Sequence, residues 1–201
     1  MAGVAPIPQV LRVPAFRTVW LASLASNGGT WLQVVAAGWL VLQLTDSPAA
    51  VGGLALAYRA PAFVLSTWGG QLADRHDWRR IGIVTFLAQG VAALALAVAT
   101  WAGVESVPLV YALTLVMGVG FAIGLPAMLA LVPALVSRDL LPQAVSLNAA
   151  GINVARLAGP TIGGVTLAFA GAGACFALNA ASFLALVAAL AVLPPLHHGR
   201  R

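Results

Sequence analysis

Two arginines lie deep inside long apolar stretches of this sequence, where a charge is costly. Arg59 follows Pro48 by about eleven residues, and Arg156 follows Gln143 by about thirteen. At 1.5 Å per helical residue, each is roughly 17–20 Å from the start of a helix, near the middle of a hydrocarbon layer about 30 Å thick. Arginines at this depth usually face a bundle interior or a wet cavity. We therefore expect them either to line a path for an anionic ligand or to bond helix carbonyls and serve packing alone.

Smaller polar side chains recur at helical spacing. In the first apolar stretch, Ser23, Asn27 and Thr30 follow one another at i, i+4 and i+7, which places them on one face of a helix. Asn153 and Arg156 likewise share one sector of a later helix. We predict that these faces line a polar substrate pathway. Its candidate residues are Asn27, Thr30, Arg59, Asn153 and Arg156.

The other reactive side chains do not form a recognisable catalytic or metal site. All three histidines, His76, His197 and His198, lie outside the apolar stretches, and Cys175 is the only cysteine. A lone cysteine cannot form an internal disulfide, and a protease acting inside a membrane would need a Ser/His pair at membrane depth. The sequence therefore predicts no enzyme activity, no metal and no cofactor.

The elements that position these residues must lie in a lipid bilayer. Of the 201 residues, 61% are hydrophobic and 7% are charged, whereas soluble domains carry about 25% charged residues. Residues 18–45, 81–104, 106–137 and 157–196 carry no charge. Backbone polar groups in a bilayer need internal partners, so long continuous apolar runs favour helices. The expected fold class is an all-α integral membrane protein.

Turn residues divide residues 16–196 into six predicted transmembrane helices. A cytoplasmic N-terminal segment (1–15) precedes this bundle, and a basic cytoplasmic tail (197–201) follows it. The cluster Gly171-Ala172-Gly173 is expected to separate the last two helices. The predicted helices are Phe16–Leu44, Pro48–Ala73, Ile81–Trp101, Leu109–Val136, Gln143–Ala170 and a last one that ends near Leu193.

Basic residues are distributed unequally between the two ends of these helices. Six crossings bring eight arginines to one end and only Asp46 and Glu105 to the other. By the positive-inside rule, the arginine-rich end and both termini are cytoplasmic. Because the arginines are spread over loops and ends, the net charge of +5 indicates orientation and no nucleic-acid partner. The eight are Arg12, Arg17, Arg75, Arg79, Arg80, Arg138, Arg200 and Arg201.

The charged loop after the second predicted helix carries a recognisable motif. Residues 70–80 read Gly-Gln-Leu-Ala-Asp-Arg-His-Asp-Trp-Arg-Arg and resemble the G-x-L-A-D-R-x-G-R-R signature between helices 2 and 3 of the major facilitator superfamily. The sequence departs from that pattern at Asp77, where glycine is usual, and at Trp78, where a basic residue is common. A solvated loop that serves only topology is the alternative. The resemblance implies a cytoplasmic conformational latch formed by Gly70, Asp74, Arg75, Arg79 and Arg80.

Two further segments resemble the same superfamily. Residues 159–164 are similar to the end of the G-P-x-x-G-G motif of its antiporters, and residues 16–53 resemble the first helix of its enterobactin-exporter-like efflux branch. The R-x-x-Q-G motif of many proton-coupled members is absent, because Thr114 and Met117 stand before Gly118. The resemblance therefore leaves the coupling ion open. The antiporter-like motif consists of Gly159, Pro160, Gly163 and Gly164.

This resemblance implies both a fold and a function. Full members have twelve helices in two halves that rock about a central site, so this chain would form the N-terminal half, a 3+3 inverted repeat. It would belong to a secondary active transporter of the bacterial inner membrane that exports a small organic molecule such as a drug or siderophore. Its partner would be a C-terminal six-helix half or a second copy, because a lone half exposes its polar cavity to lipid. A non-transporting membrane scaffold and an oligomeric six-helix channel are the alternatives.

Overall fold

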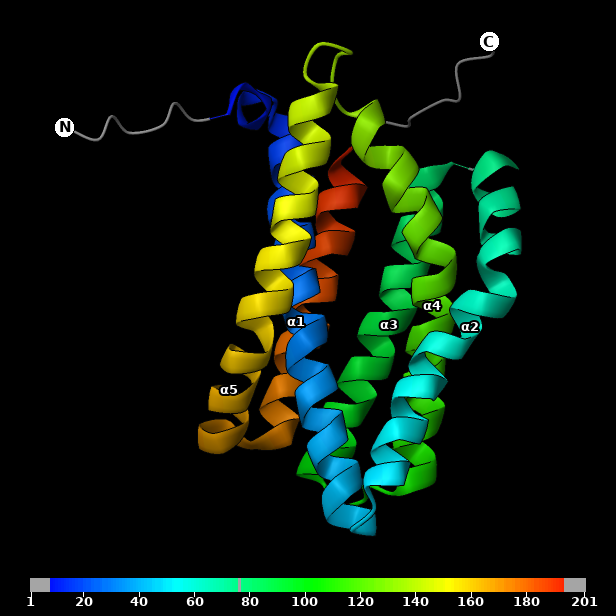
Figure 1. Ribbon diagram of the computed structural model, residues 1–201, viewed down its shortest axis with the longest axis vertical. Coiled ribbons are helices and arrows are strands. Elements are labelled where there is room, and N and C mark those ends of the chain that lie inside the picture. The colour runs from blue at the N-terminus through cyan, green and yellow to red at the C-terminus, as the bar shows by residue number, and fades with distance from the viewer. Residues whose placement is uncertain (1–7, 76, 194–201) are drawn as a thin grey trace, which may run out of the picture.

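The described part of the chain is entirely helical (Figure 1). The computed structural model describes the backbone of residues 8–75 and 77–193, and the side chains of residues 8–65 and 77–193. These residues form one short 3-10 helix and five α-helices, which confirms the predicted all-helical class. The elements are η1 (Gln9–Arg12), α1 (Pro14–Thr45), α2 (Pro48–Arg75), α3 (Trp78–Trp101), α4 (Val107–Ala134) and α5 (Leu141–Val192).

Most of these helices have the length and composition of membrane spans. Within the described residues, four segments meet both criteria: Pro48–Leu65 of α2, and the whole of α3, α4 and α5. Helix α1 has 32 residues, but its serine, asparagine, threonine and glutamine side chains lower its mean hydropathy. These helices identify a multi-pass membrane protein, whereas the count of six crossings and the inverted repeat stay predictions.

Helix α5 consists of two helices joined at a glycine. Gly171 has φ 78° and ψ 174°, which is not helical, and the chain reverses direction there. A side chain would be strained at this positive φ, whereas glycine adopts it readily. The predicted break at Gly171-Ala172-Gly173 therefore lies where the chain turns. The label α5 covers the helical arms on both sides of this turn.

The other helix ends follow from local chemistry. Prolines stand in the first turn of α1, α4 and α5, where their fixed φ suits the helix and no N–H is needed. Asp46 ends α1 in the left-handed conformation at φ 49°, which aspartate tolerates better than most residues. At the start of α3, the carboxylate of Asp77 accepts a hydrogen bond of 2.9 Å from the backbone N–H of Arg79.

Two packed pairs of helices make up the bundle. Helix α1 packs along α5, and α2 packs along α4, while α3 contacts both α4 and α5. Helices α1 and α2 have few contacts with each other, although they are consecutive in the chain. The bundle therefore has a sparsely packed region between α1 and α2, which the next section describes.

Glycines allow the close approaches within the packed pairs. A Cβ at Gly118 of α4 would collide with the backbone carbonyl of Tyr58 on α2. A Cβ at Gly163 of α5 would lie 3.1 Å from the Cα of Leu32 on α1. Small residues at such crossings let membrane helices pack through backbone contact, since lipid removes the usual hydrophobic drive.

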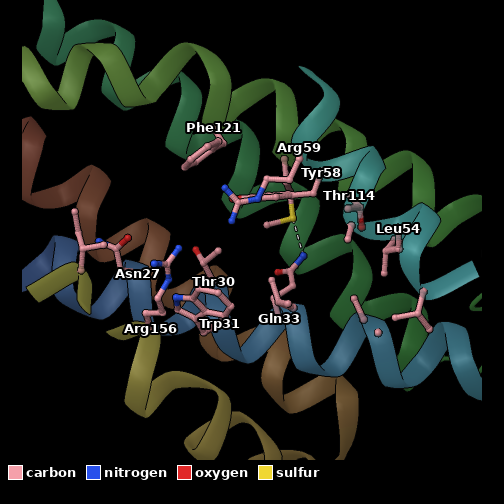
Figure 2. A pocket seen from close by; sticks show the side chains of 17 residues that line it. Asn27, Thr30, Trp31, Gln33, Leu54, Tyr58, Arg59, Thr114, Phe121 and Arg156 are labelled. Atoms are coloured by element: carbon pink, nitrogen blue, oxygen red, sulfur yellow. Dashed lines mark hydrogen bonds between the residues drawn. The ribbon is translucent and has the colours of Figure 1, made fainter. Parts of the chain in front are cut away.

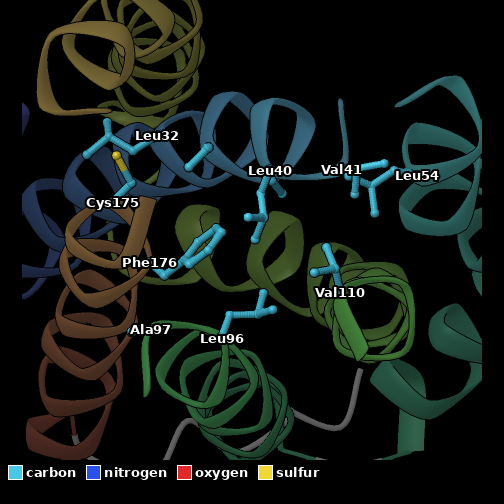
Figure 3. Close-up of a cluster of buried hydrophobic side chains, with 11 residues drawn as sticks. Leu32, Leu40, Val41, Leu54, Leu96, Ala97, Val110, Cys175 and Phe176 are labelled. Carbon is cyan, nitrogen blue, oxygen red and sulfur yellow. The ribbon is translucent and has the colours of Figure 1, made fainter. Parts of the chain in front are cut away.

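The largest apolar cluster of the described residues joins all five α-helices in the part of the bundle near the end of α1 and the start of α4 (Figure 3). Phe176 of α5 is fully buried and lies between Leu40 of α1 and Leu96 of α3. Val110 of α4 closes the cluster on the side of α2. This core fixes the relative positions of the helices on which the polar side chains stand.

The helix ends form two sets (Figure 1). One end of the bundle holds η1, the start of α1, the start of α3 and the loop between α4 and α5. The other end holds the turns around Asp46, Glu105 and Gly171. The arginines of the described loops thus share one end, as the charge pattern requires.

Candidate functional site

A cavity of about 340 Å³ lies between α1, α2, α4 and α5 (Figure 2). It occupies the region where α1 and α2 separate. Its lining combines aromatic and aliphatic side chains with a few polar groups, which is typical of small-molecule sites of 300–1,000 Å³. The residues around it are Asn27, Thr30, Trp31, Gln33, Val34, Ala37, Gly38, Val51, Leu54, Ala55, Tyr58, Arg59, Thr114, Met117, Phe121, Ile152 and Arg156.

The two arginines predicted from the sequence both line this cavity. Arg59 comes from α2 and Arg156 from the first arm of α5, and Figure 2 shows their guanidinium groups reaching into the space from opposite walls. Both side chains are exposed. Neither has a hydrogen-bond or ion-pair partner among the described residues. The helices therefore bring two unpaired positive charges into one cavity.

Arg59 is positioned by two aromatic rings. Its guanidinium carbon lies 5.8 Å from the ring centroid of Tyr58 and 5.8 Å from that of Phe121. The two rings lie 5.6 Å apart at an interplanar angle of 34°. Cation–π attraction of this kind is worth about 0.5–1 kcal/mol at an exposed site and more when water is excluded. It holds the charge at the cavity wall and leaves the guanidinium N–H groups free.

Prolines weaken the helices beside both arginines. Pro160 lies within α5 and Pro61 within α2, and a proline supplies no N–H to the carbonyl four residues earlier. The carbonyl of Arg156 loses its helical donor in this way, and so does that of Ala57. Such positions bend helices, and α2 visibly bends along its length in Figure 1. The missing hydrogen bonds therefore make the segments that carry the two charges easier to bend than a regular helix.

A buried chain of amides supports one wall of the cavity. The side-chain amide of Asn179 on α5 donates to Oε1 of Gln33 on α1 at 2.6 Å, and Gln33 donates in turn to the sulfur of Met117 on α4. Ser182 donates to the backbone carbonyl of Asn179 at 2.7 Å. Asn179 is fully buried and Gln33 is 5% exposed. This chain fixes the Gln33 side chain at the cavity and joins three helices.

Two buried hydroxyls near the cavity lack partners. Thr114 of α4 lines the main cavity, and its Oγ1 has no hydrogen-bond partner in the described structure. The Ser23 hydroxyl, also without one, lines a second cavity of about 120 Å³ that shares Asn27, Thr30 and Tyr58 with the first. Buried polar groups are normally satisfied, so these hydroxyls are available to a ligand or to water.

The sequence-predicted pathway residues separate into two groups. Asn27, Thr30, Arg59 and Arg156 all line the main cavity. Asn27 and Thr30 donate to the carbonyls of Ser23 and Ser26, respectively, one turn earlier. Thr30 therefore offers a ligand only an acceptor oxygen, whereas Asn27 keeps its amide oxygen and a second N–H. Asn153 is exposed and is not among the cavity residues. A shared helical sector therefore did not predict the cavity lining correctly, because residues 152 and 156 face the cavity but residue 153 does not.

Sequence reasoning missed several lining residues. Gln33, Tyr58 and Thr114 contribute polar groups to the cavity. Gln33 continues the polar face of Thr30 at i+3 and could have been found from that spacing. Tyr58 and Thr114 are single polar residues in apolar helices, so only the packing of α2 on α4 identifies them.

The antiporter-like motif of α5 performs two different tasks. A Cβ at Gly159 would meet the Cβ of Trp31 at 2.5 Å, and one at Gly163 would meet the backbone of Leu32. These two glycines therefore set the distance between α5 and α1. Gly164 has no atom within 4 Å of such a Cβ, and Pro160 lies one turn after Arg156. The motif thus positions Trp31 and Arg156, which both line the cavity.

The described part of the latch motif joins two helix ends. Arg79 donates from Nε to the carbonyl of Leu190 at 2.8 Å and from Nη2 to that of Ala191 at 2.6 Å. These carbonyls end α5, where a cation also stabilises the negative end of the helix dipole. Arg80 is exposed. The side chains of Gly70, Asp74 and Arg75 lie outside the described residues, so the latch itself stays a prediction.

Metal chemistry has no visible site in the described part of the chain. No three His, Cys, Asp or Glu side chains there lie close enough to hold a metal ion. Cys175 is buried, and its thiol lies 3.8 Å from the carbonyl of Gly163. The charged groups that line the cavity are therefore the two arginine side chains.

A bundle of membrane-length helices around a polar, partly aromatic cavity is typical of small-molecule transport proteins. The chain belongs to the transmembrane secretion effector family of the major facilitator superfamily, whose profile matches residues 2–199. This membership confirms the resemblance noted in the sequence. It places the chain in a family of membrane transport proteins.

Curated relatives agree with that assignment. The chain is similar to the enterobactin exporter EntS of Salmonella choleraesuis, with 30% identity over 183 residues. It is also similar to those of Citrobacter koseri (31% over 185 residues) and Shigella boydii (32% over 185 residues). Each alignment covers 90–91% of this chain but only 44% of the relative. The chain thus spans less than half the length of the curated relatives it matches.

Proposed function

We propose that this chain forms the N-terminal half of a secondary active transporter that exports a small organic molecule across the bacterial inner membrane. The observation that carries this proposal is the cavity between α1, α2, α4 and α5, in a chain of this family. Its lining comes from helices far apart in sequence, and two arginines without an ion-pair partner among the described residues reach into it. A scaffold would have no use for such charges at membrane depth, where they are costly.

Alternating access is the mechanism that suits this arrangement. The cavity opens on a face that a second six-helix half would cover, and rocking of the two halves about this central site would expose it to one side of the membrane at a time. We place both termini and the arginine-rich loops in the cytoplasm, in accordance with the positive-inside rule. The motif at residues 70–80 would then latch the cytoplasmic side in one state, with Asp74 as its central charge.

A partner is needed to complete the site. The cavity side chains Arg59 and Arg156 are exposed, and lipid would be an unfavourable neighbour for them. We propose that a C-terminal six-helix half, or a second copy of this chain, covers this face. The length of the relatives, of which this chain matches 44%, favours the C-terminal half.

Transport by everted membrane vesicles tests this function. The chain would be expressed alone and together with the C-terminal half of the Shigella boydii exporter. Uptake of radiolabelled enterobactin, chosen because the relatives are named as its exporters, would be measured first, followed by a panel of drugs. We expect flux only with both halves. Flux by the purified monomer would contradict the need for a partner.

Asp74→Asn separates a transporter from a scaffold in the same vesicles. Loss of the Asp74 charge should reduce flux at least about tenfold if the latch works by a charge interaction. Asp139→Asn is the matched control, because Asp139 is an exposed carboxylate in the loop between α4 and α5. Wild-type flux in the Asp74→Asn protein would contradict the latch, and no flux of any compound with either partner would contradict the proposed function.

A further inference from the structure

We propose that the cavity selects organic anions, with Arg59 and Arg156 holding the anionic group and the neighbouring aromatic rings holding a flat apolar body. This proposal rests on the proposed function in one respect: the bound anion would be the transported substrate. The binding itself needs no transport.

No carboxylate among the described side chains balances the positive charge in the cavity. The acidic residues whose side chains the structure describes are Asp46, Asp77, Glu105 and Asp139. Asp46 and Glu105 lie in turns at one end of the bundle, and Asp77 and Asp139 lie at the other end. Arg59 and Arg156 therefore face each other across the cavity with no described carboxylate between them. Two like charges in a confined site of low polarity attract an anion far more strongly than either would in water.

A purely structural role does not suit these two arginines. The chain shows what a structural arginine does, because Arg79 bonds two helix-end carbonyls at 2.8 and 2.6 Å. Neither Arg59 nor Arg156 bonds a carbonyl or any other described group. Their N–H groups remain available, and a guanidinium presents them in a fork that matches a carboxylate or phosphate.

The walls between the two charges favour a flat, apolar body. Tyr58 and Phe121 lie 5.6 Å apart beside Arg59, and Trp31 lines the cavity on the side of Arg156 (Figure 2). Aromatic faces of this kind stack on rings. The volume of about 340 Å³ accommodates a molecule of two fused rings.

A pair of probes of the same shape but different charge tests this selectivity. The full chain would be reconstituted in nanodiscs of phosphatidylcholine, and binding of 2-naphthoate and of neutral 2-naphthamide would be measured by equilibrium dialysis against empty nanodiscs. We expect 2-naphthoate to bind at least about tenfold more tightly, the effect of one charge-assisted hydrogen bond. Equal affinity for the two probes, or no binding of 2-naphthoate above that of empty nanodiscs, would overturn the proposal.

Arginine variants identify the source of the preference. Arg59→Gln and Arg156→Gln should each remove most of the tenfold difference, while Arg138→Gln, in an exposed loop at one end, should leave it unchanged. Arg156→Lys keeps the charge and should keep part of the preference. A preference that survives both glutamine substitutions would overturn the proposal, as would a lysine variant that behaves like glutamine. Helical circular dichroism of each variant verifies that it is folded.

Failure of this inference differs from failure of the proposed function. If 2-naphthoate binds through the arginines and no vesicle flux occurs, the anion site stands and the transport proposal fails. If the vesicles export neutral or cationic compounds and 2-naphthoate does not bind, transport stands and the anion site fails.

Discussion

Helix α1 has two very different neighbours, α5 on one side and α2 on the other. Against α5 it lies at backbone contact: a Cβ at Gly29 would lie 3.1 Å from the Cα of Asn179, and one at Gly163 would lie 3.1 Å from the Cα of Leu32. Towards α2 it leaves a cavity of about 340 Å³ lined by Arg59. The same helix thus forms a rigid seam with α5 and a loose wall against α2.

The difference shows how a membrane bundle separates stability from binding. At the seam, glycines and buried amides give close packing and satisfied polar groups, which hold membrane helices together. At the wall, the two guanidinium groups and the Thr114 hydroxyl have no hydrogen-bond partner among the described residues, so they add little to the stability of the fold. Substitutions at the seam should therefore affect stability, and those at the wall should affect ligand binding.

The seam should be most sensitive to added volume. Gly159→Ala places a methyl group against Trp31, close to its backbone, and such overpacking costs about 1–3 kcal/mol. Gly164→Ala is the matched control in the same motif, since no atom lies within 4 Å of the new methyl group. Its effect should stay within about 0.5 kcal/mol. Reversible unfolding in mixed detergent micelles measures both, and equal stabilities would show that α1 and α5 are not in backbone contact.

The buried amides should have an intermediate effect. Asn179→Leu removes the donor to Gln33 and should cost about 0.6–1.7 kcal/mol, the range for hydrogen bonds between membrane helices. The double variant with Gln33→Leu should recover part of that loss, because no amide is then left without a partner. Gln43→Leu, an exposed position on α1, is the control. Strict additivity in the double-mutant cycle would contradict a direct interaction.

Arginines at helix ends and in the cavity should show the smallest effects on stability, with a measurable difference between them. Arg79→Gln removes two hydrogen bonds to the end of α5 and should cost about 0.3–1 kcal/mol. Arg156→Gln removes no described partner and should change stability by less than about 0.3 kcal/mol. The same unfolding assay compares the two, with Arg80→Gln as an exposed control. An equal loss for Arg156→Gln would indicate a structural role for the cavity charge.

Much of the architecture could be predicted from residue types alone. Long stretches without charge predicted helices of membrane length, and Gly171 was placed at the turn within α5. Arg59 and Arg156 were predicted to lie at membrane depth because no helix of that length can place residue 59 or 156 near an end. Each of these statements depends on local sequence and on the 1.5 Å rise of a helix.

Other features depended on which helices are neighbours. Asn153 and Arg156 share a sector on a helical wheel, but the approach of α1 through Gly159 and Gly163 turns only Arg156 to the cavity. Asp77 departs from the superfamily pattern, and the structure gives it a local reason as the cap of α3. The partners of Gln33 and Arg79, which are more than 80 residues away in the chain, could not be read from spacing.

The sequence by itself determined that this chain is a helical membrane protein with two arginines at membrane depth, because lipid permits few charges and only internally bonded backbones. Only the tertiary structure decided that both arginines share one cavity and that neither has a hydrogen-bond or ion-pair partner among the described residues. The physical reason is that helix formation is local, whereas a cavity depends on which helix faces come into contact, and here glycines on α4 and α5 determine those faces.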